Sequence, residues 1–153
     1  MDDLRELYQQ MILDHQRKPR NFRAIEDAER SADGFNPLCG DRIHVDLRVA
    51  GDGRIEDVAF TGSGCAICTA SASMMTESMR GKNETEAETL FEGFHRLLTS
   101  DEPPTDARDA SGLGKLAVFA GVREFPVRVK CATLPWHTLH AALRGRNQPV
   151  STE

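Results

Sequence analysis

Four cysteines, at positions 39, 65, 68 and 131, are the residues of this sequence with the clearest capacity for chemistry. Free cysteines are often small core residues. Cys39, Cys65 and Cys131, however, stand in turn-forming segments or directly before expected helices, and not within a periodic apolar face. We therefore expect these three thiols to form a metal site or to carry out thiol chemistry.

The local setting of these thiols favours the reactive thiolate. Cys65 and Cys131 directly precede predicted helices, where unpaired backbone amides lower a thiol pKa. Asp41 follows Cys39 by two residues and offers a carboxylate from the same loop. Zinc sites usually show paired ligands with short spacers. Because Cys39, Cys65 and Cys131 are far apart in the sequence, their spacing alone does not identify a metal.

Two further features near the cysteines have more than one interpretation. Cys65 and Cys68 form a C-x-x-C pair, which is compatible with a redox pair, a metal ligand pair or no function. Arg128 and Lys130 lie just before Cys131. They are either ordinary surface charges or residues that contact a partner and stabilise the thiolates.

The apolar pattern predicts a helix, then strands, then helices. Apolar residues at helical spacing predict a first helix over residues 3–16. Alternation predicts a strand over 42–49, a second over 55–61 with a bulge near 56–57, and an earlier short strand over 31–36. Further helices are predicted over 66–80, 85–98, 109–120 and 134–144. Thr85 and Glu88 would form a capping box, and Pro135 would lie in the first turn of the last helix.

This order predicts an α+β fold, in which helices pack on one face of a small three-stranded antiparallel sheet. We expect one domain over residues 1–146 and a disordered tail over 147–153. The net charge of −5 counts against nucleic acid as a partner. The sequence shows neither a membrane-spanning run nor a signal peptide, which predicts a cytoplasmic protein with reduced thiols.

Three segments resemble the signature motifs of the IscU/SufU family, which is related to the N-terminal part of NifU. They are NPLCGDRI at 36–43, GSGCAICTASASMM at 62–75 and PVRVKCATL at 126–134. The likeness runs from Leu4 to Leu143, and the three motifs occur in the family's order. It implies an α+β fold whose cysteines cluster at one end.

Within that family the sequence resembles the SufU branch. Lys130 occupies the position where IscU-type members have a histidine, and the stretch between Gly81 and Lys115 is longer than in those members. By resemblance, Cys39, Asp41, Cys65 and Cys131 would bind one zinc ion. SufU-type members usually have serine at the position of Cys68, which leaves this residue as a spare thiol, a redox partner of Cys65 or a packing residue.

The resemblance implies a zinc-dependent sulfurtransferase in iron–sulfur cluster assembly. Its partner would be a pyridoxal-phosphate cysteine desulfurase of the SufS type, which passes sulfur to Cys39, and a downstream iron–sulfur scaffold would receive the sulfur. The alternative is a scaffold on which the same cysteines hold a nascent [2Fe–2S] cluster; Lys130 in place of histidine counts against it. A purely structural zinc domain is the third interpretation.

Overall fold

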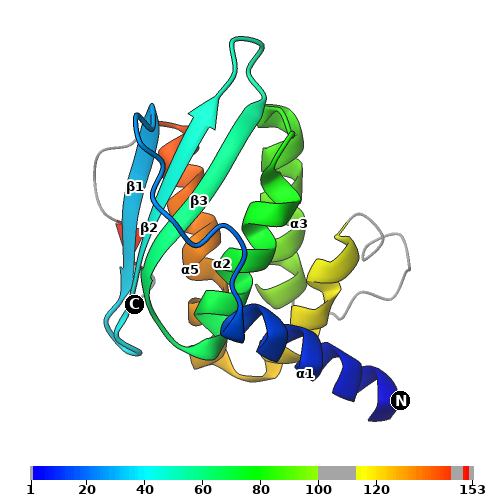
Figure 1. Ribbon diagram of the computed structural model, residues 1–153. Helices are drawn as coiled ribbons and strands as arrows, with labels where there is room; N and C mark the ends of the chain where they lie inside the picture. The colour runs from blue at the N-terminus through cyan, green and yellow to red at the C-terminus, as the bar shows by residue number, and fades with distance from the viewer. Residues whose placement is uncertain (1, 100–112, 146–149, 152–153) are drawn as a thin grey trace.

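A computed structural model describes residues 2–99, 113–145 and 150–151 of the chain (Figure 1). A sheet lies on one side, with its strands in the order β3 (Ile55–Ser63), β2 (Asp41–Val49), β1 (Arg30–Asn36) and β4 (Val150–Ser151). The helices α2 (Ala66–Met79), α3 (Glu84–Thr99) and α5 (Pro126–Leu143) lie on the other side. The structure therefore confirms the α+β fold with helices on one face of the sheet. The N-terminal helix α1 (Asp2–Arg17) packs against α2 at one end of the molecule.

The three predicted strands form the antiparallel part of the sheet. They are β1 (Arg30–Asn36), β2 (Asp41–Val49) and β3 (Ile55–Ser63), with β2 between the other two. Arg48 pairs with Asp57 and Val49 pairs with Ile55, so Glu56 is the extra residue of a bulge where one was predicted. Alternate residues of β2 fill the core beneath the helices: Ile43, Val45 and Leu47.

A fourth strand, β4 (Val150–Ser151), pairs in parallel with Gly34 and Phe35 of β1. The sequence predicted a disordered tail over 147–153, and this pairing was missed because two residues carry no readable alternation. Residues 146–149 and 152–153 lie outside the described part of the chain.

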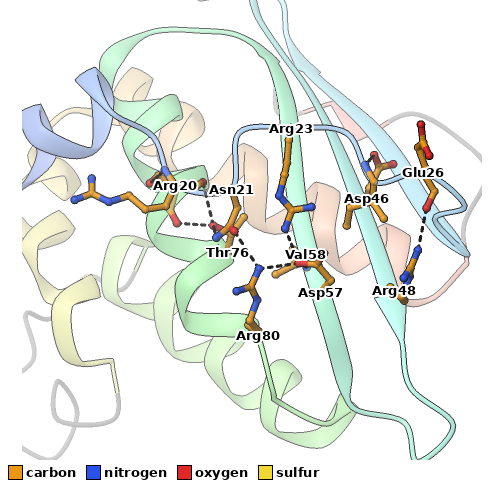
Figure 2. Close-up of polar contacts among 12 residues, drawn as sticks. Arg20, Asn21, Arg23, Glu26, Asp46, Arg48, Asp57, Val58, Thr76 and Arg80 are labelled. Carbon is orange, nitrogen blue, oxygen red and sulfur yellow. Dashed lines mark hydrogen bonds and ion pairs between the residues drawn. The ribbon is translucent and has the colours of Figure 1, made fainter.

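The other face of the sheet is crossed by the segment that joins α1 to β1, here named the strap (residues 18–29) (Figure 2). In Figure 2, Arg23 and Arg80 both reach Asp57, whose Oδ1 accepts a hydrogen bond from each guanidinium, at 2.8 and 2.7 Å. The two guanidinium groups outweigh the effect of burial and lower the pKa of Asp57. These hydrogen bonds tie the strap and the end of α2 to the edge strand β3.

His44 on the outer face of β2 lies between two carboxylates. Its Nδ1 is 2.8 Å from Asp33 Oδ1 and its Nε2 is 2.7 Å from Asp46 Oδ1. Asp46 is buried, and its other oxygen accepts the backbone N–H of Ile25 from the strap at 3.0 Å. Burial lowers the pKa of His44, but the hydrogen bonds to both carboxylates outweigh it and raise that pKa. Through these contacts, His44 and Asp46 link β1, β2 and the strap.

Helix α2 (Ala66–Met79) is the central helix, with nine of its residues buried. Small residues allow close packing, and its serines satisfy polar groups inside the core. Ser71 Oγ donates to the Ala132 carbonyl at 2.6 Å and accepts from Trp136 Nε1 at 3.0 Å. Ser73 Oγ accepts the backbone N–H of Arg20 at 2.8 Å, which fixes the start of the strap against α2.

The last helix, α5 (Pro126–Leu143), begins eight residues earlier than predicted. Pro126 occupies the first turn, where proline suits the free N–H position, whereas Pro135 lies inside the helix. The prediction took the second proline for the helix start because an internal proline removes a hydrogen bond. As a consequence, Cys131 lies in the second turn of α5 and not before the helix.

Helix α3 (Glu84–Thr99) confirms the predicted helix but not its cap. Asn83 and Glu86 form the capping box, since each side chain accepts the other's backbone N–H, at 2.8 and 3.1 Å. Glu88 instead binds His140 and Arg144 of the α5 end. The weaker helix predicted over 109–120 is a 3₁₀ helix, η1 (Gly114–Glu124); residues 109–112 lie outside the described part of the chain.

Candidate metal centre

Cys39 is presented by a tight turn between β1 and β2. The backbone N–H groups of Cys39 and Gly40 both donate to the Asn36 carbonyl, at 3.3 and 2.9 Å. Gly40 has φ +73°, a conformation that favours glycine. Cys39 itself is half-buried. The turn thus holds a thiol at the end of the sheet while leaving it accessible.

Cys131 approaches the same point from α5. Its sulfur lies 3.1 Å from the Cys39 sulfur, although the residues are 92 positions apart. Cys131 is fully buried, and the side-chain amide of Asn36 donates to its sulfur at 3.8 Å. The amide donor, also fully buried, favours negative charge on sulfur at a site without solvent.

Asp41 is the first residue of β2 and is fully buried. Its Oδ1 accepts the backbone N–H of Cys65 at 2.8 Å, and its Oδ2 lies 3.9 Å from the Cys65 sulfur. The structure groups one possible ligand atom from each of three residues, and these atoms all lie within 4.8 Å of one another: Cys39, Asp41 and Cys131. A buried carboxylate between two thiols requires a compensating charge, which a cation would supply.

Cys65 lies beside this group at the N-terminus of α2. It is the N-cap residue, and its sulfur accepts the backbone N–H of Cys68 at 3.4 Å. Its contact with Asp41 brings it to the edge of the cluster, but its sulfur is not part of the set within 4.8 Å. The structure therefore brings three of the four predicted ligands into one cluster and places the fourth against the carboxylate.

The donor set fits tetrahedral zinc. With zinc–sulfur distances of about 2.3 Å, two thiolates on one tetrahedral ion lie about 3.8 Å apart. The 3.1 Å between the Cys39 and Cys131 sulfurs and the 3.9 Å between the Cys65 sulfur and Asp41 Oδ2 are close to this spacing. The Cys65 sulfur, which lies outside the set within 4.8 Å, would have to move closer to complete the tetrahedron. Burial, followed by hydrogen bonds to Cys39 and Asp41, raises the pKa of the Cys131 thiol. A bound cation acts in the opposite direction and favours the thiolate.

Arg128 is the charged residue that the structure places directly on the thiols. The charge of Cys65 and then that of Cys131 raise the pKa of its guanidinium. Its side chain is exposed, so it can also meet a partner. Lys130, the other predicted partner-contact residue, is half-buried on the first turns of α5.

The cluster opens to the surface through a depression of about 590 Å³. Cys39 and Cys65 line it together with residues 124–128, which join the end of η1 to the start of α5. Three large apolar side chains near this opening are exposed: Leu38 by 63%, Phe125 by 59% and Val127 by 52%. The two sulfurs that line the depression therefore lie near exposed apolar side chains.

Cys68 lies behind the cluster and is only 2% exposed. Burial, followed by the charges of Asp41, Cys65 and Cys39, raises the pKa of its thiol. All four cysteines are free thiols. Cys68 is therefore a reduced, protected sulfur one helical turn from Cys65.

Two residues that shape the cluster, Asn36 and Gly64, were not predicted from the sequence. Asn36 both shapes the Cys39 turn and donates to Cys131, and its signal was the Asn-Pro pair that opens the turn. Gly64 provides space: a Cβ at this position would lie 3.0 Å from Asp41 Oδ1 and 3.3 Å from the Cys68 sulfur. Its signal was the Gly62-Ser63-Gly64 run, which indicates close backbone approach.

Comparisons with known proteins agree with this architecture. A family model described as the NifU-like N terminal domain matches residues 7–132. The chain is 41% identical over 133 residues to the Bacillus subtilis protein named zinc-dependent sulfurtransferase SufU, covering 87% of this chain and 86% of that one. It is 37% identical over 144 residues to the Streptococcus pyogenes iron–sulfur cluster assembly scaffold protein IscU, covering 94% and 87%.

A solved structure from Fervidobacterium islandicum shares the fold with a TM-score of 0.79 and 34% identity, covering 87% of this chain and 93% of that one. It is described as a proposed iron–sulfur cluster assembly scaffold protein for the SUF system. Among the residues that the structure describes here, no helix combines the length and the apolarity needed to cross a bilayer.

Proposed function

Because this chain belongs to the family of NifU-like N-terminal domains, we propose that it is a zinc-dependent sulfurtransferase of iron–sulfur cluster assembly. A cysteine desulfurase would supply the sulfur as a persulfide, and a downstream iron–sulfur scaffold would receive it. The similarity to a protein named as a zinc-dependent sulfurtransferase supports this assignment. Such chemistry needs reduced thiols and therefore a reducing compartment such as the cytoplasm.

One observation carries the proposal: the cluster combines an accessible thiol with a buried one. Cys39 is half-buried on a turn, while Cys131 and Asp41 are fully buried. Cys39 can therefore leave the cluster to react while Cys131, Asp41 and Cys65 remain in place. We assign all four residues as ligands of one zinc ion. When bound, zinc would keep the thiolates deprotonated at neutral pH.

Cys39 is the proposed sulfur acceptor. Its thiolate attacks the outer sulfur of the desulfurase persulfide, which forms a new S–S bond on Cys39. The persulfide S–S bond breaks, and the desulfurase cysteine leaves as a thiolate. Arg128 lies beside Cys65 and Cys131, and its positive charge stabilises the sulfur anions while Cys39 reacts.

The surface around the cluster suits a protein partner. Leu38, Phe125 and Val127 are exposed at the opening, and Arg128 and Lys130 add positive charge beside them. Interfaces are enriched in aromatic residues and arginine at their centres. We propose that the desulfurase docks over this surface and brings its persulfide to Cys39.

The test is desulfurase turnover in the presence of Cys39→Ala. We expect this variant to lose the stimulation that the unaltered protein gives, because the acceptor sulfur is absent. Cys68→Ala is the matched control, since it also removes one sulfur, and it should retain most of the stimulation. Unchanged stimulation by Cys39→Ala would exclude Cys39 as the acceptor.

The second candidate is a scaffold that assembles a [2Fe–2S] cluster on the same cysteines. The similarity to a protein named as an IscU scaffold favours it. Lys130 cannot replace the histidine ligand that IscU-type members have there, because an ammonium group is not a ligand. Zinc in a one-to-one ratio without visible absorption would support the transferase, whereas a brown, iron-bearing protein would support the scaffold.

A further inference from the structure

Cys65 and Cys68 differ in their exposure to solvent, and a metal site does not require this difference. Cys65 is half-buried and lines the open depression, whereas Cys68 is 2% exposed and lies in the core. Cys65 is the N-cap residue directly before α2, and Cys68 lies in the first turn of that helix. The Cys65 sulfur accepts the backbone N–H of Cys68 at 3.4 Å. Small oxidants can reach the first sulfur and not the second.

We propose that Cys65 and Cys68 form a reversible redox pair, in which the buried Cys68 thiol traps an oxidised Cys65 as a disulfide at the N-terminus of α2. Side chains three residues apart on a helix have Cβ atoms about 5–6 Å apart, and a disulfide requires about 3.5–4.5 Å. The closure is small, and Cys65 can provide it because its backbone is extended, with φ −69° and ψ 170°.

The chemistry balances with hydrogen peroxide as the oxidant. The Cys65 thiolate attacks one peroxide oxygen, the O–O bond breaks, and Cys65 becomes a sulfenic acid while hydroxide leaves. The Cys68 sulfur then attacks the Cys65 sulfur. The S–O bond breaks, water leaves with the Cys68 proton, and a disulfide forms. Two electrons pass from the two thiols to one peroxide.

The position of Cys68 makes the oxidation of Cys65 reversible. Without a second thiol, a sulfenic acid proceeds to sulfinic acid, which is generally irreversible. With Cys68 one turn away, oxidation stops at a disulfide that a reduced dithiol can reopen. Because Cys65 contacts Asp41, its oxidation also removes one thiolate from the proposed ligand set. We therefore expect oxidation to release metal and reduction to restore binding.

Another pair competes for oxidation, since the sulfurs of Cys39 and Cys131 lie 3.1 Å apart. Trypsin separates the two outcomes. Cleavage after lysine and arginine places Cys65 and Cys68 together in peptide 55–80, Cys39 in peptide 31–42 and Cys131 in peptide 131–144. One pair gives a disulfide within a peptide, and the other gives a cross-link between two peptides.

The experiment treats the full chain with hydrogen peroxide, blocks free thiols with iodoacetamide and digests with trypsin. We expect peptide 55–80 to lose about 2 Da and to carry no alkyl group, as a disulfide requires. Dithiothreitol should restore both thiols and the metal content. The Cys39→Ser variant, which lacks the competing pair, should give the same result at 55–80.

In Cys68→Ser, peptide 55–80 should instead gain about 32 Da, the mass of two oxygens in a sulfinic acid, and dithiothreitol should not reverse it. Cys68→Ala repeats the test if serine is not tolerated at this buried position. The proposal is overturned if peptide 55–80 retains two alkylatable thiols after oxidation, or if wild type and Cys68→Ser recover equally. Neither readout depends on sulfur transfer, so the proposed function can fail or hold separately.

Discussion

The space above Gly64 allows a direct test of how the cluster is held together. Gly64→Ala adds a Cβ that would lie 3.0 Å from Asp41 Oδ1, 3.2 Å from the Cys68 Cβ and 3.3 Å from the Cys68 sulfur. The backbone of Gly64 is not in the positive-φ region, so alanine fits the conformation and only the contacts are perturbed. Asp41 must then move by a few tenths of an ångström.

The expected magnitude follows from two opposing effects. Overpacking a well-filled site costs about 1–3 kcal/mol, while replacing glycine by alanine recovers about 0.4–1 kcal/mol from the unfolded chain. We expect a net loss of about 0–2.5 kcal/mol in the free energy of unfolding. Displacing the carboxylate also disturbs the ligand set, and changes of this kind lower metal affinity about 10- to 100-fold.

The assay is zinc competition with a chromogenic chelator, combined with urea denaturation. Gly121→Ala is the matched control, because a Cβ there meets nothing within 4 Å and its φ is not positive. It should leave zinc affinity unchanged. Adding Cys68→Ala to Gly64→Ala tests which contact matters: a full rescue would implicate the sulfur and not the carboxylate. Wild-type zinc affinity in Gly64→Ala would refute the role of Asp41 in the cluster.

Two further predictions concern the sheet. Since the folded-state pKa of His44 is raised, its stabilisation is complete below the unfolded pKa of about 6.5 and is lost as pH rises through the folded pKa. His44→Gln should therefore cost more stability at about pH 6 than at about pH 9, and an equal cost at both would contradict the raised pKa. Gly34→Ala places a Cβ 2.1 Å from Thr138 Oγ1 and should destabilise the fold by about 3 kcal/mol or more in urea denaturation; a change below about 0.5 kcal/mol would show that α5 moves away from β1 without cost.

The strands and central helices were predictable because their residues follow simple periods. Alternation in β2 matches its buried residues, and the change of parity in β3 located the bulge at Glu56. The small residues of α2 indicated a closely packed helix, although not its serine hydrogen bonds to the strap and to α5.

The start of α5 and the cap of α3 could not be derived because each had two plausible local solutions. Pro126 and Pro135 both suit a first turn in isolation, and only the packing of α5 along β1 and β2 places Pro135 inside the helix. Asn83 and Glu86 cap α3, since Glu88 binds His140 and Arg144 of the α5 end. Tertiary contacts decided both cases.

For the candidate site, the motifs predicted four ligands, of which the structure groups Cys39, Asp41 and Cys131, but they did not predict how these residues are arranged. The order of the elements alone does not indicate that Cys131 meets Cys39 at 3.1 Å while Cys65 stays against Asp41. Asn36 and Gly64 were overlooked because a side-chain amide donor and an absent Cβ have no periodic signal. Their roles become visible only when the turn, β2 and α2 converge.

The most direct measurement is the X-ray absorption spectrum of the zinc-loaded protein at the zinc edge. If Cys39, Asp41, Cys65 and Cys131 surround one ion, the spectrum should show three sulfur ligands at about 2.3 Å and one oxygen at about 2.0–2.2 Å. Replacing Cys65 by alanine should reduce the sulfur count by one. A wild-type spectrum with two sulfurs or fewer, or with histidine nitrogen in the shell, would contradict the assignment.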